Sequence, residues 1–317
     1  MKHEVKVVGL LLAMFLFTQL LGLIVIDAYT PKTTIQIVDG IEVNVTTGQT
    51  IPYNLEPPQV EPQISFASIT LSFVIAIIIF LILTKLKAHT LIRIWFTFVV
   101  FITMSVSLTA ILGKFLPELV LGVDKVALLL AIPLTFYKIF KRNIVVHNLT
   151  ELLVYPGLAT IFVPILRPWS VILLLVIISF YDMWAVWRSQ FMVNLAKYQI
   201  ENLKVFTGFF VPYLPKKEYD KLQKVKMIKQ KSLAKKRMNG VKVSLALLGG
   251  GDVAFPLIFA GVMLRYGGGL VPALLVILGS TLGLLWLFIY SKKGKFYPAM
   301  PFITIGAMAG WLIGFLV

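Results

Sequence analysis

The chain has 317 residues, of which 58% are hydrophobic and only 14% are charged, and its formal net charge is +16. A soluble domain carries about a quarter of its residues as charged side chains, so this composition excludes a soluble globular protein and indicates a membrane protein. The absence of cysteine excludes a disulfide framework, a thiolate nucleophile and a Cys-ligated metal.

Apolar runs long enough to cross a bilayer recur along the chain, and a run of about 18 residues or more is typical of a spanning helix. The first run follows two lysines and could be a cleaved signal peptide, but its length and poor cleavage site favour a helix of the mature protein. The sequence therefore predicts an all-α polytopic membrane protein, a single membrane domain over residues 1–317. The nine predicted spans are Val7–Ile26, Ile64–Thr84, Ile94–Gly113, Leu119–Tyr137, Val146–Ile165, Pro168–Trp187, Val243–Leu264, Leu270–Tyr290 and Tyr297–Val317.

The distribution of lysine and arginine predicts the orientation of these spans. With nine spans, 25 of the 30 basic residues fall on the side of the N-terminus. Basic loops stay in the cytoplasm, so we expect a cytoplasmic N-terminus and an extracytoplasmic C-terminus. The positive charge then reflects topology and contact with lipid headgroups. It does not indicate nucleic acid, because the basic loops lack interleaved aromatic residues for base stacking.

The first long connection, residues 27–63, is expected outside. Alternating apolar residues flank Asp39-Gly40, a dipeptide that suits a two-residue turn, so we predict a hairpin of Ile35–Val38 with Ile41–Val45. This loop is either a structured connection or an element on which substrates dock.

The second long connection, residues 188–242, is expected in the cytoplasm between a first part, residues 1–187, and a last part, residues 243–317. Residues Phe191–Phe210 mix apolar and polar side chains, which is typical of a helix lying at the membrane interface. That position, directly after Asp182, suggests a gate to the site. The remainder is basic and is expected to contact anionic lipid.

Two acids, Asp182 and Asp252, fall well inside the predicted spans. An ionisable residue there marks a functional site by default. At a rise of about 1.5 Å per residue, Asp182 lies about 8 Å from the cytoplasmic end of its span and Asp252 about 13 Å from the start of the next. Since the two spans are consecutive and antiparallel, we expect the carboxyls to come close together.

The residues around Asp252 predict an irregular helix. Gly249, Gly250 and Gly251 precede the acid, and glycines weaken a helix and allow close backbone approach. Pro256 removes the hydrogen bond to the carbonyl of Asp252. Packing alone could explain the glycines, but the acid beside them favours a break next to a water-containing cavity lined by protein.

Two neighbouring carboxyls suggest acid–base chemistry. Both cannot ionise cheaply, so one keeps its proton. The ionised carboxyl can activate water while the protonated one acts as the acid, without a metal or cofactor. This is the chemistry of aspartic proteases. The sequence lacks the His-Glu-x-x-His and Gly-x-Ser-x-Gly motifs of zinc and serine hydrolases, and its three histidines lie at or beyond span ends.

Three motifs resemble those of the presenilin and signal peptide peptidase family, which carries Tyr-Asp, Gly-x-Gly-Asp and Pro-Ala-Leu on the same spans. The likeness covers the nine-span plan and the long loop after the sixth span, and the short chain is similar to microbial members. A methionine replaces the leucine of the third motif, a change of similar size that we expect to be tolerated. The basic loop lacks an apolar plug, which argues against self-cleavage. The residues that carry the resemblance are Tyr181-Asp182, Gly249-Gly250-Gly251-Asp252 and Pro298-Ala299-Met300-Pro301.

The resemblance implies an intramembrane aspartyl protease whose catalytic pair is Asp182 and Asp252. Its substrates would be transmembrane segments of other proteins or signal-peptide remnants in the lipid bilayer of the cell membrane. Tyr181 would shape the site, and Gly249 and Gly251 would let the backbone reach its active form. Pro298, Ala299 and Met300 would line the site and help to hold the substrate. That run could instead be a helix start, where proline is favoured. The implied supporting set is Tyr181, Gly249, Gly250, Gly251, Pro298, Ala299, Met300 and Pro301.

Three other classes fit parts of the sequence. A proton- or cation-coupled secondary transporter would also use broken helices and two acids near the membrane midplane, but it would more often show breaks in two halves. A non-catalytic scaffold leaves both acids unexplained. A prepilin-type peptidase shares Gly-x-Gly-Asp but lacks the nine-span plan. The sequence does not specify the natural substrate, the cleaved bond, partner subunits or the oligomeric state.

Overall fold

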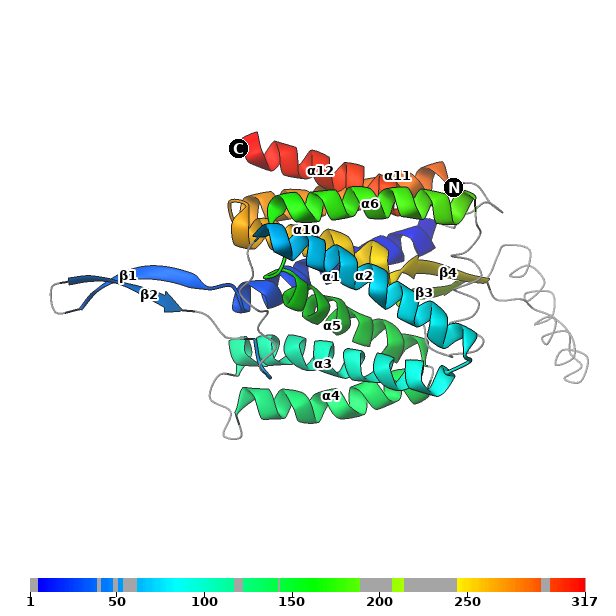
Figure 1. Cartoon of the computed structure of the whole chain (residues 1–317), viewed down its shortest axis with the longest axis horizontal. Helices are drawn as coiled ribbons and strands as arrows, with labels where there is room; N and C mark the ends of the chain where they lie inside the picture. The colour runs from blue at the N-terminus through cyan, green and yellow to red at the C-terminus, as the bar shows by residue number, and fades with distance from the viewer. Residues whose placement is uncertain are drawn as a thin grey trace, which may run out of the picture.

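The structure, a computed structural model, describes residues 5–38, 41–47, 51–53, 62–116, 122–141, 143–188, 207–213, 244–291 and 297–316. Within these residues, nine helices run alongside one another and two small antiparallel sheets lie at opposite ends of the bundle (Figure 1). The helices are α1 (Val5–Ala28), α2 (Pro62–Lys85), α3 (His89–Phe115), α4 (Val123–Phe140), α5 (Ile144–Phe162), α6 (Pro168–Trp187), α10 (Gly250–Tyr266), α11 (Leu270–Tyr290) and α12 (Met300–Leu316). The strands are β1 (Lys32–Val38), β2 (Ile41–Thr47), β3 (Gly208–Tyr213) and β4 (Ser244–Gly249).

Each predicted span overlaps one of these helices, and α6 and α11 have the predicted bounds. Pro168 begins α6, a position that proline favours because its missing N–H would be unpaired there anyway. By length and composition, five of the described helices can cross a membrane, and α12 is a shorter apolar helix. The chain is thus a multi-pass membrane protein. The five are α1, α3, α5, α6 and α11.

The hairpin predicted around Asp39-Gly40 is present as β1 and β2. Val38 pairs with Ile41, and the antiparallel register continues to Lys32 opposite Thr47. The strands are therefore longer than the sequence predicted, while the turn itself lies outside the described residues. In Figure 1 this hairpin projects from the end of the bundle that also holds the C-terminus, and β3 and β4 lie at the other end.

The structure differs from the prediction at the start of the seventh span. Residues 244–249 were expected to be helical, yet they form β4, and α10 begins only at Gly250. The prediction of an interfacial helix is also wrong for its last residues, because they belong to β3, which pairs with β4. The rest of Phe191–Phe210 lies outside the described residues. The periodicity of a short apolar run does not distinguish a strand from a buried helix. Here the run is a strand because it pairs with β3, which lies far from it in the sequence.

α10 is the central helix of the bundle. It packs against α1, α5, α6, α11 and α12, and most of its residues are buried. The sheet is also half buried, since Phe209 and Val211 of β3 and Ala246 and Leu248 of β4 belong to the same core. This places the β4–α10 junction in the interior of the molecule.

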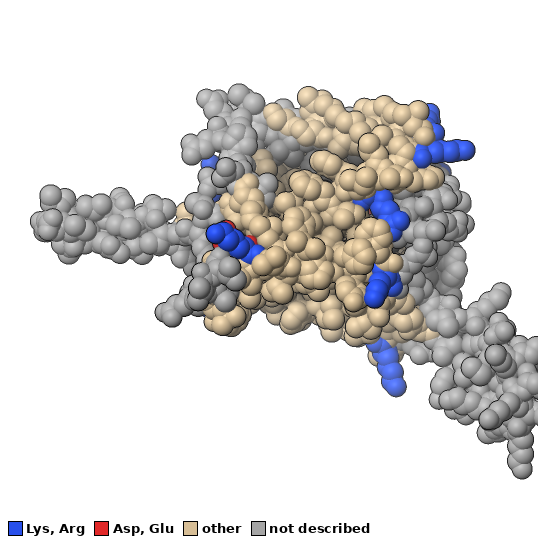
Figure 2. All heavy atoms as spheres, turned by 90° about the horizontal axis from the view of Figure 1, so that it is seen from below, with Lys and Arg blue, Asp and Glu red and all other residues tan. Residues whose placement is uncertain are grey.

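The surface of the bundle suits a lipid environment. Seen from the side on which α4 lies, it is uncharged over most of its width (Figure 2). The basic side chains visible there stand mainly toward the end at which Figure 1 places β3 and β4. Large apolar side chains such as Trp95 and Trp286 are 66% exposed. An apolar exterior between charged ends is expected of helices in a bilayer.

Candidate active site

The change from strand to helix places Asp252 at the N-terminus of α10. Gly249 is the N-cap residue, so Asp252 is the third residue of the helix. The backbone N–H of Gly249 donates to the carboxyl of Asp252, as in the capping box, in which the third residue reaches back to the N-cap amide. A Cβ on Gly249 would lie 3.0 Å from Oδ2 of Asp252. Glycine at this position therefore leaves room for the acid.

The expected break in the helix exists, but its form differs from the prediction. The helix does not break near Pro256, which lies inside a continuous α10; the chain changes from strand to helix at Gly249. The depth estimate for Asp252 assumed a helix from Val243 and does not hold, because strand residues rise about twice as far each. Asp252 is partly exposed, and Gly251 beside it is exposed.

The three glycines are not equivalent. A Cβ on Gly250 would lie 2.9 Å from the hydroxyl oxygen of Tyr155 and 3.1 Å from the Cβ of Thr207. A Cβ on Gly251 would meet only the ring of Phe255, at 3.4 Å. The resemblance implied special roles for Gly249 and Gly251, whereas an added Cβ would be crowded at Gly249 and Gly250.

Asp182 lies on α6 with 5% of its surface exposed, and the start of α12 supplies its hydrogen-bond donors. The amide of Met300 donates to its Oδ2 at 3.0 Å, and the amide of Ala299 donates to the same carboxyl. Nearby, the hydroxyl of Ser179 donates to that of Thr304 at 2.9 Å and joins the two helices. The backbone of the proline-rich motif is thus in contact with Asp182.

The proline-rich run is also a helix start. α12 begins at Met300, so Pro298 precedes the helix and Pro301 lies in its first turn. Proline is tolerated there because first-turn amides have no partner within the helix. Between the two prolines, the amides of Ala299 and Met300 remain free to donate to Asp182. The motif is therefore both the start of a helix and a source of hydrogen-bond donors to Asp182.

The structure brings the two acids together. Helices α6 and α10 pack against each other, and the carboxyls of Asp182 and Asp252 are near enough for their charges to interact. Each carboxyl also accepts backbone hydrogen bonds at the N-terminus of a helix, where the helix dipole favours negative charge. These donors offset part of the cost of placing a carboxylate inside an apolar bundle. Two carboxyls this near each other can act together as base and acid toward a bound molecule.

Tyr181 lies beside this pair, at the surface. Its side chain is 40% exposed, its ring centroid is 6.2 Å from that of Trp184, and it interacts electrostatically with Asp182.

Two buried polar residues near Asp252 were missed in the sequence. Gln19 of α1 donates from Nε2 to the carbonyl of Val253 at 2.9 Å, and the hydroxyl of Tyr155 lies against Gly250. A glutamine in the middle of an apolar run was a signal for Gln19, whereas nothing local distinguishes Tyr155. Among the described residues, no group of three or more His, Cys, Asp or Glu side chains is arranged to hold a metal ion.

Comparisons with known proteins agree on one family. The family model for signal-peptide peptidase, presenilin aspartyl protease matches residues 34–317. One solved structure of a presenilin family intramembrane aspartate protease, in space group C222, is 18% identical with a TM-score of 0.60, over 97% of this chain and 98% of that chain. Another, in space group P2, is 20% identical with a TM-score of 0.57, over 96% and 95%. At these identities the likeness shows the fold. No curated protein sequence matches the chain.

Proposed function

This chain belongs to the family of signal-peptide peptidase and presenilin aspartyl proteases, and we propose that Asp182 and Asp252 are its catalytic pair. The observation that carries the proposal is the placement of both carboxyls, close to each other and each at the N-terminus of a helix. The family and the fold support an aspartic peptidase that acts within the membrane. Neither supports the proton- or cation-coupled transporter.

The mechanism follows from a pair of carboxyls that share one proton. The ionised carboxyl accepts a proton from a water molecule, which attacks the carbonyl carbon of the peptide bond. The protonated carboxyl donates its proton to the developing oxyanion. As the C–N bond breaks, the carboxyl that took the proton from water passes it to the leaving nitrogen, and the other carboxyl takes a proton back from a hydroxyl of the intermediate, so the pair again holds one proton. Because the two carboxyls titrate as a pair, we do not specify which of them is the base and which is the acid.

The substrate is a transmembrane segment, whose backbone is shielded by its own helical hydrogen bonds. The scissile stretch therefore has to unwind and pair elsewhere, as an added strand does. β4 offers such an edge. Its alternate residues Leu245 and Leu247 direct N–H and C=O away from β3, and within the described residues no hydrogen bond reaches them. Two residues after Leu247, the chain enters the Gly249–Asp252 junction.

We further propose nine membrane crossings in the cell membrane, with the N-terminus in the cytoplasm and the C-terminus outside. The basic residues support this orientation, since 25 of 30 lie on one side. Figure 1 agrees, because the start of α1 lies at the end with β3 and β4, and the C-terminus lies at the opposite end. The partners are transmembrane-helix proteins or signal-peptide remnants in the lipid bilayer; the oligomeric state is left open.

The test is cleavage of a tagged single-span protein by the purified chain in liposomes. Wild type is compared with Asp182→Asn and Asp252→Asn, and with Asp124→Asn as a matched control, because Asp124 is exposed at the start of α4. We expect each of the first two substitutions to lower kcat/KM by at least about 100-fold, the scale of lost acid–base catalysis. The control should cleave like wild type. Full cleavage by either substituted protein, with unchanged thermal unfolding, would remove that acid from the pair.

A further inference from the structure

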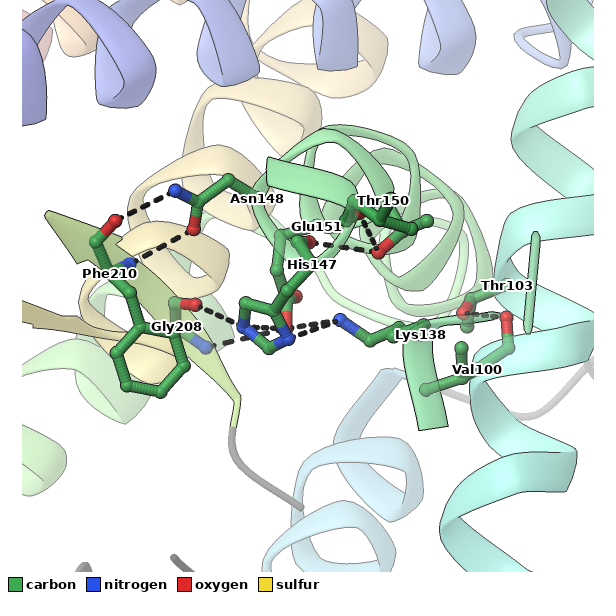
Figure 3. Close-up of polar contacts among 10 residues, drawn as sticks. Val100, Thr103, Lys138, His147, Asn148, Thr150, Glu151, Gly208 and Phe210 are labelled. Atoms are coloured by element: carbon green, nitrogen blue, oxygen red, sulfur yellow. Dashed lines mark hydrogen bonds and ion pairs between the residues drawn. The ribbon is translucent and has the colours of Figure 1, made fainter. Parts of the chain in front are cut away.

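The outer edge of β3 is closed by side chains of α5 (Figure 3). Nδ2 of Asn148 donates to the carbonyl oxygen of Phe210 at 2.7 Å, and the amide of Phe210 donates to Oδ1 of Asn148 at 3.0 Å. Facing residues of an antiparallel pair exchange the same two hydrogen bonds. The side-chain amide of Asn148 thus occupies the place of a third strand.

The residues on either side of Phe210 are closed as well. The carbonyl of Gly208 lies 2.8 Å from Nε2 of His147, and the amide of Gly208 donates to Oε1 of Glu151 at 3.5 Å. Pro212 has no N–H to offer. Because these alternate residues are the ones that face away from β4, β3 has no complete site for another strand.

A buried ion pair holds these side chains in place. Nζ of Lys138, on α4, lies 2.7 Å from Oε1 of Glu151, and both side chains are at most 1% exposed. The same ammonium lies 3.4 Å from Nδ1 of His147. A ring that donates from Nε2 to Gly208 accepts at Nδ1, so all these contacts are compatible. A buried charge is costly without its partner, so the pair keeps α4, α5 and the edge of β3 in one arrangement.

We propose that His147, Asn148 and Glu151, together called the edge clamp, position the substrate. By closing β3, the edge clamp makes the sheet one-sided, so that within the described sheet a strand can add only to β4. By holding β3, it also fixes the lateral position of β4, which runs directly into Gly249 and Asp252. The register of a substrate strand, and hence the bond that reaches the acids, depends on the edge clamp. This inference rests on the proposed function.

The test compares Asn148→Leu, Asn148→Asp and Thr150→Val in the full-length protein in liposomes. Leucine removes both hydrogen bonds to Phe210, while aspartate keeps only an acceptor. Thr150 is the matched control, because it is buried on the same helix but donates only to the α5 carbonyls of Val146 and His147. KM and kcat are measured, the cleaved bonds are identified by mass spectrometry, and hydrogen exchange is followed at the backbone amides of β3, which exclude Pro212.

We expect Asn148→Leu to raise KM several-fold with a smaller change in kcat, to spread cleavage over neighbouring bonds and to speed exchange in β3. Asn148→Asp should fall between it and wild type, and Thr150→Val should match wild type. Cleavage at the wild-type bond with the KM of the control would overturn the positioning role, and so would unchanged exchange in β3. A wild-type protein that fails to cleave, or an active Asp252→Asn, would overturn the proposed function itself. Faster exchange in Asn148→Leu would then still show the edge contact without a substrate role.

Discussion

At the scale of single residues, Gly250 occupies the most tightly packed position of the triple-glycine run. An added Cβ would press on the hydroxyl of Tyr155 and on the side chain of Thr207. Tyr155 is itself buried and packs edge-to-face on Phe209 of β3, at a centroid distance of 5.7 Å. Neither neighbour can retreat without moving β3 or α5, so the cost falls on the junction that carries Asp252.

We therefore predict that Gly250→Ala impairs the protein more than Gly251→Ala. The first should lose about 1–3 kcal/mol of stability, the usual cost of overpacking, and most of its cleavage activity. The second should stay close to wild type in stability, because its Cβ would only touch the ring of Phe255. Thermal unfolding in detergent and cleavage of a single-span substrate measure both. Equal losses in the two variants would contradict this account of the packing.

The residues that the sequence revealed are those whose chemistry is out of place locally. Asp182 and Asp252 are ionisable groups in apolar runs, and they could be found without any structure. Tyr155 could not be found, because its importance comes from contact with Gly250, almost a hundred positions along the chain. The tight position within the glycine run was missed for the same reason, since it depends on what lies opposite each Cα.

At the scale of elements, α11 and α12 form the closest helix pair. A Cβ on Gly279 would collide with the carbonyl of Gly306, and a Cβ on Gly306 would collide with that of Gly279. Gly283 and Gly310 face backbone carbonyls of the partner helix in the same way. Small residues at such spacing let two helices approach at backbone distance in a membrane. Because α12 also presents its first amides to Asp182, this contact supports the site.

We predict that Gly306→Ala separates α11 from α12, lowers the unfolding temperature by several degrees and reduces cleavage. Gly9→Ala is the matched control, because a Cβ on Gly9, also within a helix, would meet nothing within 4 Å. That variant should be at least as stable as wild type, since alanine favours a helix by about 1 kcal/mol over glycine. Thermal unfolding and cleavage rates decide the comparison. Tolerance of Gly306→Ala would show that the two backbones can separate without cost.

Elements differ in how well the sequence predicted them. The bounds of α6 and α11 followed from the length of apolar runs that end at a proline, at glycines and at polar residues. The sequence did not predict β4, because its six residues continue the apolar pattern of α10 without interruption. Only the partner strand, β3, makes residues 244–249 extended. That partner comes from the far end of a long connection.

At the scale of the whole molecule, the proposed topology assigns the two ends of α4 to opposite sides of the membrane. Lys125 and Lys141 are exposed at these ends, and the chain has no cysteine. In the single variants Lys125→Cys and Lys141→Cys, the introduced thiol is therefore the one group in the chain that a maleimide labels. In intact cells, a membrane-impermeant maleimide should modify Lys125→Cys and should reach Lys141→Cys only after lysis. The opposite pattern would invert the topology.

The open edge of β4 also has a consequence for the supply of water. Within the described residues, the outward N–H and C=O groups of Leu245 and Leu247 have no hydrogen-bond partner, and Leu247 is 42% exposed. Peptide groups without a protein partner are satisfied by water, so on the proposed function water occupies this edge until a substrate strand docks. The proposed docking of a substrate strand would displace this water from an edge that continues directly into the Gly249–Asp252 junction. Hydrolysis consumes one water molecule for each bond cleaved, so docking of the substrate would release the second reactant beside the proposed catalytic acids.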